Sequence, residues 1–506
     1  MMLTFIRKAA SAFGVLALLV SIAAAQDPIN WAIVEDEWFA LELAGSPCGF
    51  AHMRTESGRE ADGIELWRSS SDTTMRVGRA GAAIEVQIGW SFIETADGKP
   101  RSAEVNQSTG GAVMKSQYEF VADGVAATTT QGGRTTQRKL PALPGQWLTP
   151  HAADAYADAQ RQAQAASYTV RMLDPSNGLQ VVTAVSTRDG SERLGVGADA
   201  ADMARWRTTN DLLPVPAIEW FDAKGQLMVT ETAMPFGALR MTRSTEAAAS
   251  GKGAATVASP EIMLSTMSKP DQPIGSPRSA KRIVYRIRSV DGKPITLPSA
   301  GAQVVTPLDD GALEVVVDVA VPGAATTEEI ADARFRDASP MLDSADERIQ
   351  KLAAQGLKKA ADGATPREQA TALRAFVERY INHKGLSSAF ASASEVAKSK
   401  SGDCSEHAML LAALLRAANI PSRVAAGMVY VDEFAGQQNV FGWHMWTQAL
   451  IDGKWVDLDA TLGVDFDAAH LLAATTAQHM DAMDPALGGM VGLIGNLRIE
   501  VVGVGR

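Results

Sequence analysis

One run of the sequence constrains the fold more than any other: CSEHAMLLAALLRA, which begins at Cys404. Apolar residues recur at helical spacing on one side of this run, and further apolar residues fill the other side. A helix that is apolar nearly all round has to be buried. Asn419-Ile420-Pro421 then ends the helix, because proline cannot continue it. The sequence therefore predicts a domain built around a central helix whose first residue is a cysteine.

The residues around Cys404 predict how this helix starts. Asp403, followed by Glu406, resembles a capping box with Asp in place of the usual Ser or Thr. Cys404 would then lie on the first turn, where free N–H groups and about half a positive charge favour a thiolate. The same N–H groups could bind the oxyanion of a tetrahedral intermediate. The two carboxylates oppose the thiolate, so this chemistry needs a cation nearby, usually a histidine.

Of the seven histidines, His444 has a plausible partner. It lies in a predicted strand over 443–451, which Asp452-Gly453 joins to a second strand that ends near Asp459. Two antiparallel strands joined by a tight turn place their far ends side by side, so His444 and Asp459 should be neighbours. A carboxylate at one ring nitrogen fixes the tautomer and leaves the other to exchange a proton with sulfur. The pattern predicts a Cys–His–Asp arrangement for acyl transfer.

The segments GDCSEHAMLLAALLRAANIPSR, HMW and LDAT resemble the transglutaminase-like superfamily, which shares its core with papain-like cysteine proteases. The resemblance covers about residues 370–461. It implies that Cys404 is the nucleophile, His444 the base and Asp459 the orienting acid, and Trp446 matches the aromatic residue of a His-x-Trp pattern. It also implies an α+β papain-like core at the C-terminal end, with no metal and no organic cofactor.

Three aromatic side chains are predicted to lie near this site. Trp443 and Trp446 flank His444, and they could shield the histidine–thiolate pair from water. Plain core packing is the alternative for both. Tyr430 ends a predicted strand over 423–430 and could line a substrate cleft.

The same residues allow other functions. In the enzymatic interpretation the substrate is a protein or peptide, and water or an amine resolves the thioester. The main alternative is a catalytically inactive scaffold or binding module of the cell envelope. A zinc site formed by Cys404, His407 and His444 is a weaker alternative, because the chain has no second pair of cysteines. No metal ligand is assigned.

The first 25 residues predict a secretory signal peptide. Arg7-Lys8 precede an apolar run over 9–20, and three alanines at 23–25 supply a cleavage site after Ala25. The apolar run is shorter than the ~20 residues that a membrane span needs. The mature chain should therefore be secreted or periplasmic, without a membrane span. The other cysteine, Cys48, could pair with the one at 404, although the two lie in segments that look like different domains.

The remaining sequence divides into four regions. Residues 26–245 read as antiparallel β structure, with Asp97-Gly98 and Lys224-Gly225 as hairpin turns. Residues 246–281 read as a linker, 282–338 as a further β segment, and 339–506 as the transglutaminase-like core, with a helical patch near 470 and a closing strand. The chain has 47 Lys and Arg against 58 Asp and Glu, which argues against nucleic acid as a partner. The oligomeric state is left open.

Overall fold

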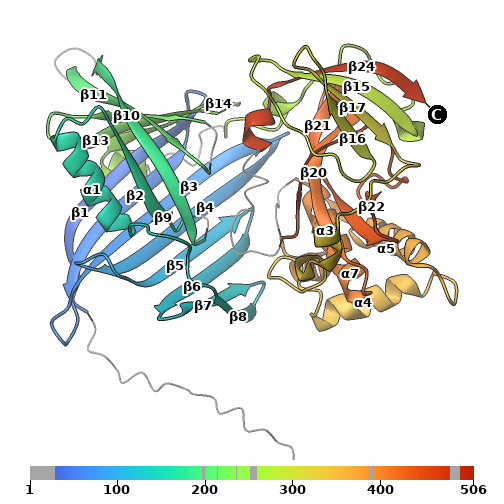
Figure 1. Ribbon diagram of the computed structural model, residues 1–506, viewed down its shortest axis with the longest axis horizontal. Coiled ribbons are helices and arrows are strands. Elements are labelled where there is room, and N and C mark those ends of the chain that lie inside the picture. Colours follow the sequence, from blue (N-terminus) through green and yellow to red (C-terminus); the bar gives the residue numbers. More distant parts are fainter. Residues whose placement is uncertain are drawn as a thin grey trace, which may run out of the picture.

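The computed structural model of the chain describes residues 29–505 apart from 177, 196–199, 213–214, 235, 251–258, 387–390 and 479–489. The predicted signal peptide lies outside the described residues. Within the described part, no helix combines the length and apolarity that a bilayer crossing needs. The chain is mostly antiparallel sheet, and most of its helices follow residue 326 (Figure 1). This confirms the predicted α+β class, with β structure ahead of the core.

Residues 32–244 form one antiparallel sheet of 14 strands, in the order β8-β7-β6-β5-β4-β3-β2-β1-β14-β13-β12-β11-β10-β9. The two halves of the sheet join where β1 pairs with β14, so β8 and β9 are its edges. Two of its hairpins turn at the predicted glycines, Gly98 and Gly225, whose φ angles are 78° and 82°. The strands are β1 Ala32–Leu43, β2 Ser46–Arg59, β3 Glu65–Arg79, β4 Ala82–Thr95, β5 Pro100–Thr109, β6 Ala112–Val121, β7 Gly124–Gln131, β8 Arg134–Leu140, β9 Ser167–Asp174, β10 Gln180–Leu194, β11 Ala201–Asn210, β12 Ala217–Phe221, β13 Leu227–Met234 and β14 Gly237–Ser244.

The far ends of this sheet pack against each other. Leu173 of β9 joins a buried cluster with Phe92 of β4 and Tyr118 of β6. Helix α1, Pro150–Gln162, connects the two edges of the sheet. Its first-turn amides donate hydrogen bonds to the carboxylate of Glu94 on β4 at 3.0 and 3.1 Å. Burial of this apolar cluster, together with the anchored helix, holds the sheet in a curved form.

The rest of the described β structure is two four-stranded sheets, with orders β16-β17-β15-β24 and β22-β21-β20-β23, and the two-stranded sheet β18-β19. The last strand, β24, pairs with β15, so it closes the first of these sheets and not the core sheet. Figure 1 shows the core sheet between that first sheet and the helices. The strands are β15 Arg282–Ser289, β16 Gln303–Pro307, β17 Leu313–Asp318, β20 Ser422–Phe434, β21 Gln437–Ile451, β22 Lys454–Leu458, β23 His470–Thr476 and β24 Leu497–Gly505, with the short pair β18 His383–Lys384 and β19 Ser401–Gly402.

Helix α7, Cys404–Ala417, is the centre of the core, as its apolar sequence predicts. Every residue from Ser405 to Arg416 is buried. Thr447 of β21 donates from its hydroxyl to the carbonyl of Ala408 at 3.0 Å, which ties the core sheet to the helix. Asn419, at a φ of 60°, follows the end of the helix. The surrounding helices are α2 Glu246–Ala249, α3 Thr327–Ala331, α4 Glu347–Leu357, α5 Pro366–Tyr380 and α6 Ala393–Ser399, with 3₁₀ turns at Leu264–Thr266, Pro277–Ser279, Ala333–Phe335 and Met490–Leu493.

Candidate active site

Cys404 is the first residue of α7, and a capping box fixes the backbone around it. Oδ1 of Asp403 accepts a hydrogen bond from the backbone N–H of Ser405 at 2.8 Å, and Oε2 of Glu406 accepts from the N–H of Asp403 at 2.8 Å. The cap uses the N–H groups of Ser405 and Glu406 but not that of Cys404. Cys404 is partly exposed and forms no disulfide. Its own N–H lies in the first turn, at the positive end of the helix dipole.

Glu406 opposes a thiolate less than its sequence position suggests. Its side chain is buried, and its second oxygen accepts a hydrogen bond from the N–H of Ala391 at 3.1 Å. Burial, and then the charge of Asp403, raise the pKa of Glu406 to about 7. At neutral pH this carboxyl is thus partly protonated, and Asp403 carries most of the negative charge beside Cys404.

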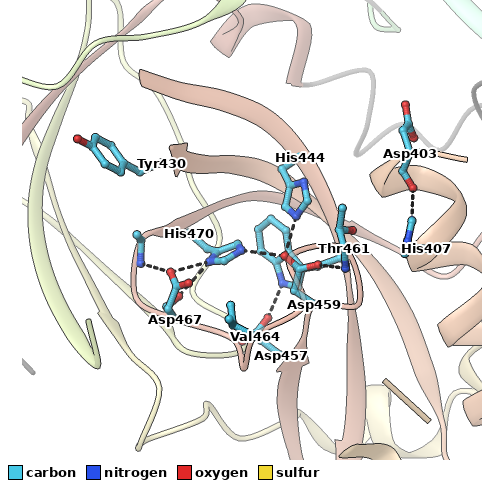
Figure 2. Close-up of polar contacts among 12 residues, drawn as sticks. Asp403, His407, Tyr430, His444, Asp457, Asp459, Thr461, Val464, Asp467 and His470 are labelled. Carbon is cyan, nitrogen blue, oxygen red and sulfur yellow. Dashed lines mark hydrogen bonds and ion pairs between the residues drawn. The ribbon is translucent and has the colours of Figure 1, made fainter. Parts of the chain in front are cut away.

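The predicted partners of the cysteine meet at the end of the β21–β22 hairpin. His444 lies on β21 and Asp459 directly follows β22. Nε2 of His444 is 2.8 Å from Oδ2 of Asp459, and both side chains are buried (Figure 2). Oδ1 of Asp459 accepts from the N–H of Thr461 at 2.6 Å. Cys404 acts on the same imidazole and helps to raise its pKa. Because Nε2 faces the carboxylate, Nδ1 is the nitrogen left for the sulfur.

The electrostatics of this trio favour a charged histidine. Burial would lower the pKa of His444, but Asp459 and Cys404 outweigh it and raise that pKa to about 9. Burial would likewise raise the pKa of Asp459, yet His444 and His470 hold it well below its usual range. An imidazolium at neutral pH stabilises an adjacent thiolate, which is the reactive form of cysteine.

A second histidine, which sequence analysis did not assign to the site, faces the same carboxylate. Nε2 of His470 lies 3.3 Å from Oδ2 of Asp459, and its Nδ1 lies 3.2 Å from Oδ1 of Asp467 (Figure 2). Arg278 in turn pairs with Asp467: its Nη1 lies 2.8 Å from Oδ2 of that aspartate. The predicted helical patch here is instead strand β23, which begins at His470 and pairs with β20. Asp467, three residues earlier, was the one local signal of a partner.

The ligand atoms of His444, Asp459 and His470 lie within 4.8 Å of one another, a spacing that could suit a cation. However, His444 Nε2 and Asp459 Oδ2 are 2.8 Å apart, whereas two ligands on one tetrahedral zinc ion lie about 3.3 Å apart. We therefore interpret this group as a hydrogen-bonded one. The alternative zinc ligand His407 is buried, with Nδ1 2.6 Å from the carbonyl oxygen of Asp403. We therefore interpret His407 as a residue that hydrogen-bonds the backbone at the start of α7.

Trp446, which was predicted to shield His444 from water, packs beside the ring of that histidine. Its side chain is 2% exposed, and its indole N–H donates to Oδ1 of Asp457 at 2.7 Å. Its ring stacks near that of His444, with centroids 6.2 Å apart and an interplanar angle of 22°. The ring thus separates His444 from solvent on one side and is at the same time part of the core.

The other two aromatic residues are directed into a different part of the core. Trp443 precedes His444 on β21, and because side chains alternate along a strand it faces the opposite side. It packs against the cluster that contains Tyr430 and Phe441. Tyr430 is 0% exposed, and its hydroxyl donates to Oδ1 of Asn439 at 2.8 Å. In this structure Tyr430 therefore offers no surface to a substrate.

A cysteine at the start of a buried helix, packed on an antiparallel sheet that carries a histidine–aspartate pair, defines the core of transglutaminase-like and papain-like cysteine enzymes. The model of the transglutaminase-like superfamily matches residues 351–460, so this segment of the chain is a transglutaminase-like domain. The matched range contains Cys404, His444 and Asp459 and ends before His470. No curated protein sequence matches the chain.

Three solved structures resemble parts of the chain. A β-barrel-like protein of a domain of unknown function from Brucella abortus is 10% identical, covers 42% of this chain and 95% of its own, and has a TM-score of 0.30. A candidate cysteine protease from Cytophaga hutchinsonii is 17% identical and covers 43% and 83%, with a TM-score of 0.28. A candidate protease from Parabacteroides distasonis is 12% identical and covers 70% and 64%, with a TM-score of 0.18. At these scores the likenesses carry no further conclusion.

Proposed function

We propose that this protein is an exported transglutaminase-like cysteine enzyme that hydrolyses or transfers amide bonds of a protein or peptide through a thioester. One observation carries the proposal: the buried imidazole of His444 lies 2.8 Å from Asp459, and Cys404 helps to raise the pKa of the same ring. The position of Cys404 at a helix N-terminus and the superfamily match over 351–460 support it. Export rests on the predicted signal peptide alone.

The chemistry follows from the positions of these groups. The Cys404 thiolate attacks the amide carbonyl carbon, a C–S bond forms, and the electron pair of the C=O bond moves to oxygen. In this proposal the N–H of Cys404, in the first turn of the helix, donates to that oxyanion. When the intermediate collapses, the C–N bond breaks and His444 gives its proton to the leaving amine, which leaves a thioester and a neutral imidazole. Asp459 keeps the ring oriented throughout.

The second half of the reaction reverses these roles. Neutral His444 takes a proton from water or from an amine as it attacks the thioester carbon. The C–S bond then breaks and the thiolate is restored. Water yields a carboxylic acid and makes the protein a protease or amidase, whereas an amine yields a new amide. The choice depends on which acceptor reaches the thioester.

The test is to trap the acyl-enzyme on the full-length protein. We would incubate it with a p-nitrophenyl ester and with a glutamine-containing peptide, with and without a primary amine, and follow Cys404 by peptide mass. An acyl adduct on Cys404 that is absent in Cys404→Ser and slow in His444→Ala is the expected result. Cys48→Ser is the matched control, because that thiol is 6% exposed and burial raises its pKa to about 11. Turnover that persists in Cys404→Ser would show that Cys404 is not the nucleophile, and no adduct in the wild type would leave the scaffold alternative.

A further inference from the structure

The N-terminal sheet reaches the first turn of α7 through one side chain. Arg79, the last residue of β3, places Nη2 2.7 Å from Oδ2 of Asp403. The two residues are 324 positions apart in the sequence, and their side chains are only 19% and 6% exposed. The hairpin that carries Arg79 turns at Ala80-Gly81, where both residues have positive φ angles. A hairpin end of the N-terminal sheet is thus seated beside the proposed nucleophile.

A second hairpin of the same sheet contacts the core close by. Gln131, the last residue of β7, donates from Nε2 to Sδ of Met341 at 3.1 Å. Gly132, in the following turn, lies against Glu395 of α6, so closely that a Cβ there would be 2.9 Å from its Cγ. Figure 1 shows the β7–β8 hairpin directed toward the helices of the core. The contact of Arg79 is therefore one of several between the N-terminal sheet and the core, which together form a docking surface.

Asp403 carries a charge one residue from the sulfur. Its Oδ1 accepts from the N–H and the hydroxyl of Ser405 at 2.8 and 2.7 Å, and its Oδ2 faces Arg79. Burial by itself would raise the pKa of Asp403, but Arg79 and Ser405 hold it below its ordinary value. A carboxylate this close to a thiolate disfavours it, and a guanidinium on that carboxylate offsets the effect.

The geometry points to the N-terminal domain as the part of the chain that sets the reactivity of Cys404: Arg79 is a positioning residue whose guanidinium neutralises the N-cap carboxylate of Asp403. This inference rests on the proposed function, because it takes Cys404 as the nucleophile. The thiolate is fully favoured only while the β3–β4 hairpin is docked. The large sheet is then a component that activates the core.

The core itself does not supply the same charge. Among the described residues, Arg79 is the cation that contacts the carboxylate of Asp403. Lys384 lies nearby, but its ammonium group donates to the carbonyl of Thr461 at 3.1 Å. The charged or titratable side chains that face this end of α7 are Arg79, Lys384, Asp403, Glu406, His407, His444 and Asp459.

The experiment measures the rate at which iodoacetamide alkylates Cys404 of the full-length protein from pH 5 to 9, read by peptide mass. The variants are Arg79→Ala, Arg79→Lys, Asp403→Asn, and Arg79→Ala combined with Asp403→Asn. Asn caps helices as well as Asp, so Asp403→Asn removes the charge and keeps the helix start. The matched control is Arg76→Ala on the same strand, since Arg76 pairs with Glu85 at 2.8 Å on the exposed surface.

We expect Arg79→Ala to slow alkylation of Cys404 about tenfold at the acid side of the profile. Arg79→Lys should restore most of the rate, and Arg76→Ala should match the wild type. In the Asp403→Asn background the Arg79 change should have a clearly smaller effect, because the carboxylate that holds the guanidinium beside the helix start is gone. A merely structural role of Arg79 would not predict this difference. A wild-type profile in Arg79→Ala, or an equal shift in both backgrounds, overturns the inference. The proposed function is tested separately by His444→Ala: it fails if that variant alkylates Cys404 at the wild-type rate.

Discussion

His444 and His470 share one oxygen atom: Oδ2 of Asp459 lies 2.8 Å from Nε2 of the first and 3.3 Å from Nε2 of the second. Both ring nitrogens of His470 face oxygen atoms, because its Nδ1 lies 3.2 Å from Oδ1 of Asp467. Carboxylate oxygens only accept hydrogen bonds, so His470 needs a proton on each nitrogen. Burial would lower the pKa of His470, but Asp459 and Asp467 raise it to about 9. Asp459 therefore accepts hydrogen bonds from two imidazolium groups, and its negative charge stabilises both.

His444→Ala should remove the selective reactivity of Cys404. Without the imidazolium, the cysteine loses the cation that stabilises its thiolate, and alkylation by iodoacetamide at pH 6 should slow by about 10–100-fold. Cys48 in the same digest is the internal standard, because burial raises its pKa to about 11. Equal rates for wild type and variant across the pH range would contradict a Cys404–His444 ion pair.

Asp459→Ala should destabilise the core strongly. It leaves His444 and His470 buried and charged without the carboxylate between them, and removing one partner of a buried ion pair costs about 3–5 kcal/mol. Urea unfolding followed by tryptophan fluorescence measures the loss. Asp465→Ala is the control, since Asp465 is 79% exposed and its pair with Arg374, at 3.4 Å, lies at the surface. A loss no larger than that of the control would mean that Asp459 does not hold the two rings.

His470→Gln should make His444 more basic. The variant removes a positive charge whose ring centroid is 5.7 Å from that of His444, and it leaves Asp459 to one imidazole. We expect the pKa of His444, followed by NMR of histidine-labelled protein, to rise above its value of about 9. The matched control is His52→Gln, which removes another histidine that pairs with one aspartate, Asp36, in the N-terminal sheet. An unchanged or lower pKa of His444 would show that His470 does not act through Asp459.

Stability should fall on the alkaline side of neutrality. The pKa of His444 and of His470 is about 9 in the folded chain, above the ordinary 6.5. A group whose pKa is raised on folding stabilises fully below its unfolded value and loses that contribution as pH rises through its folded value. The free energy of unfolding should thus decline between about pH 6.5 and 9, by up to about 3 kcal/mol for each histidine. Urea midpoints over this range test it, and His470→Gln should flatten the decline.

Local sequence was sufficient for the central helix and for part of the site, but it wrongly predicted helix near His470, where strand β23 begins. The apolar repeat after Cys404 predicted a buried helix, because such a surface has no other stable place. The pair His444–Asp459 also followed from local rules, since one tight turn joins the two strands that carry them. The same rules could not place Trp443 and Tyr430, because a predicted strand does not reveal which other elements pack against each of its side chains.

The sequence by itself determined the helix start at Cys404, its cap and the hairpin that brings His444 to Asp459, since each depends on contacts between residues close in the chain. Only the tertiary structure decided that His470 reaches Asp459 and that Arg79 reaches Asp403. Those contacts depend on how β23 pairs with β20 and on how one sheet docks on another. Packing of distant surfaces sets both, and no local pattern of residues encodes it.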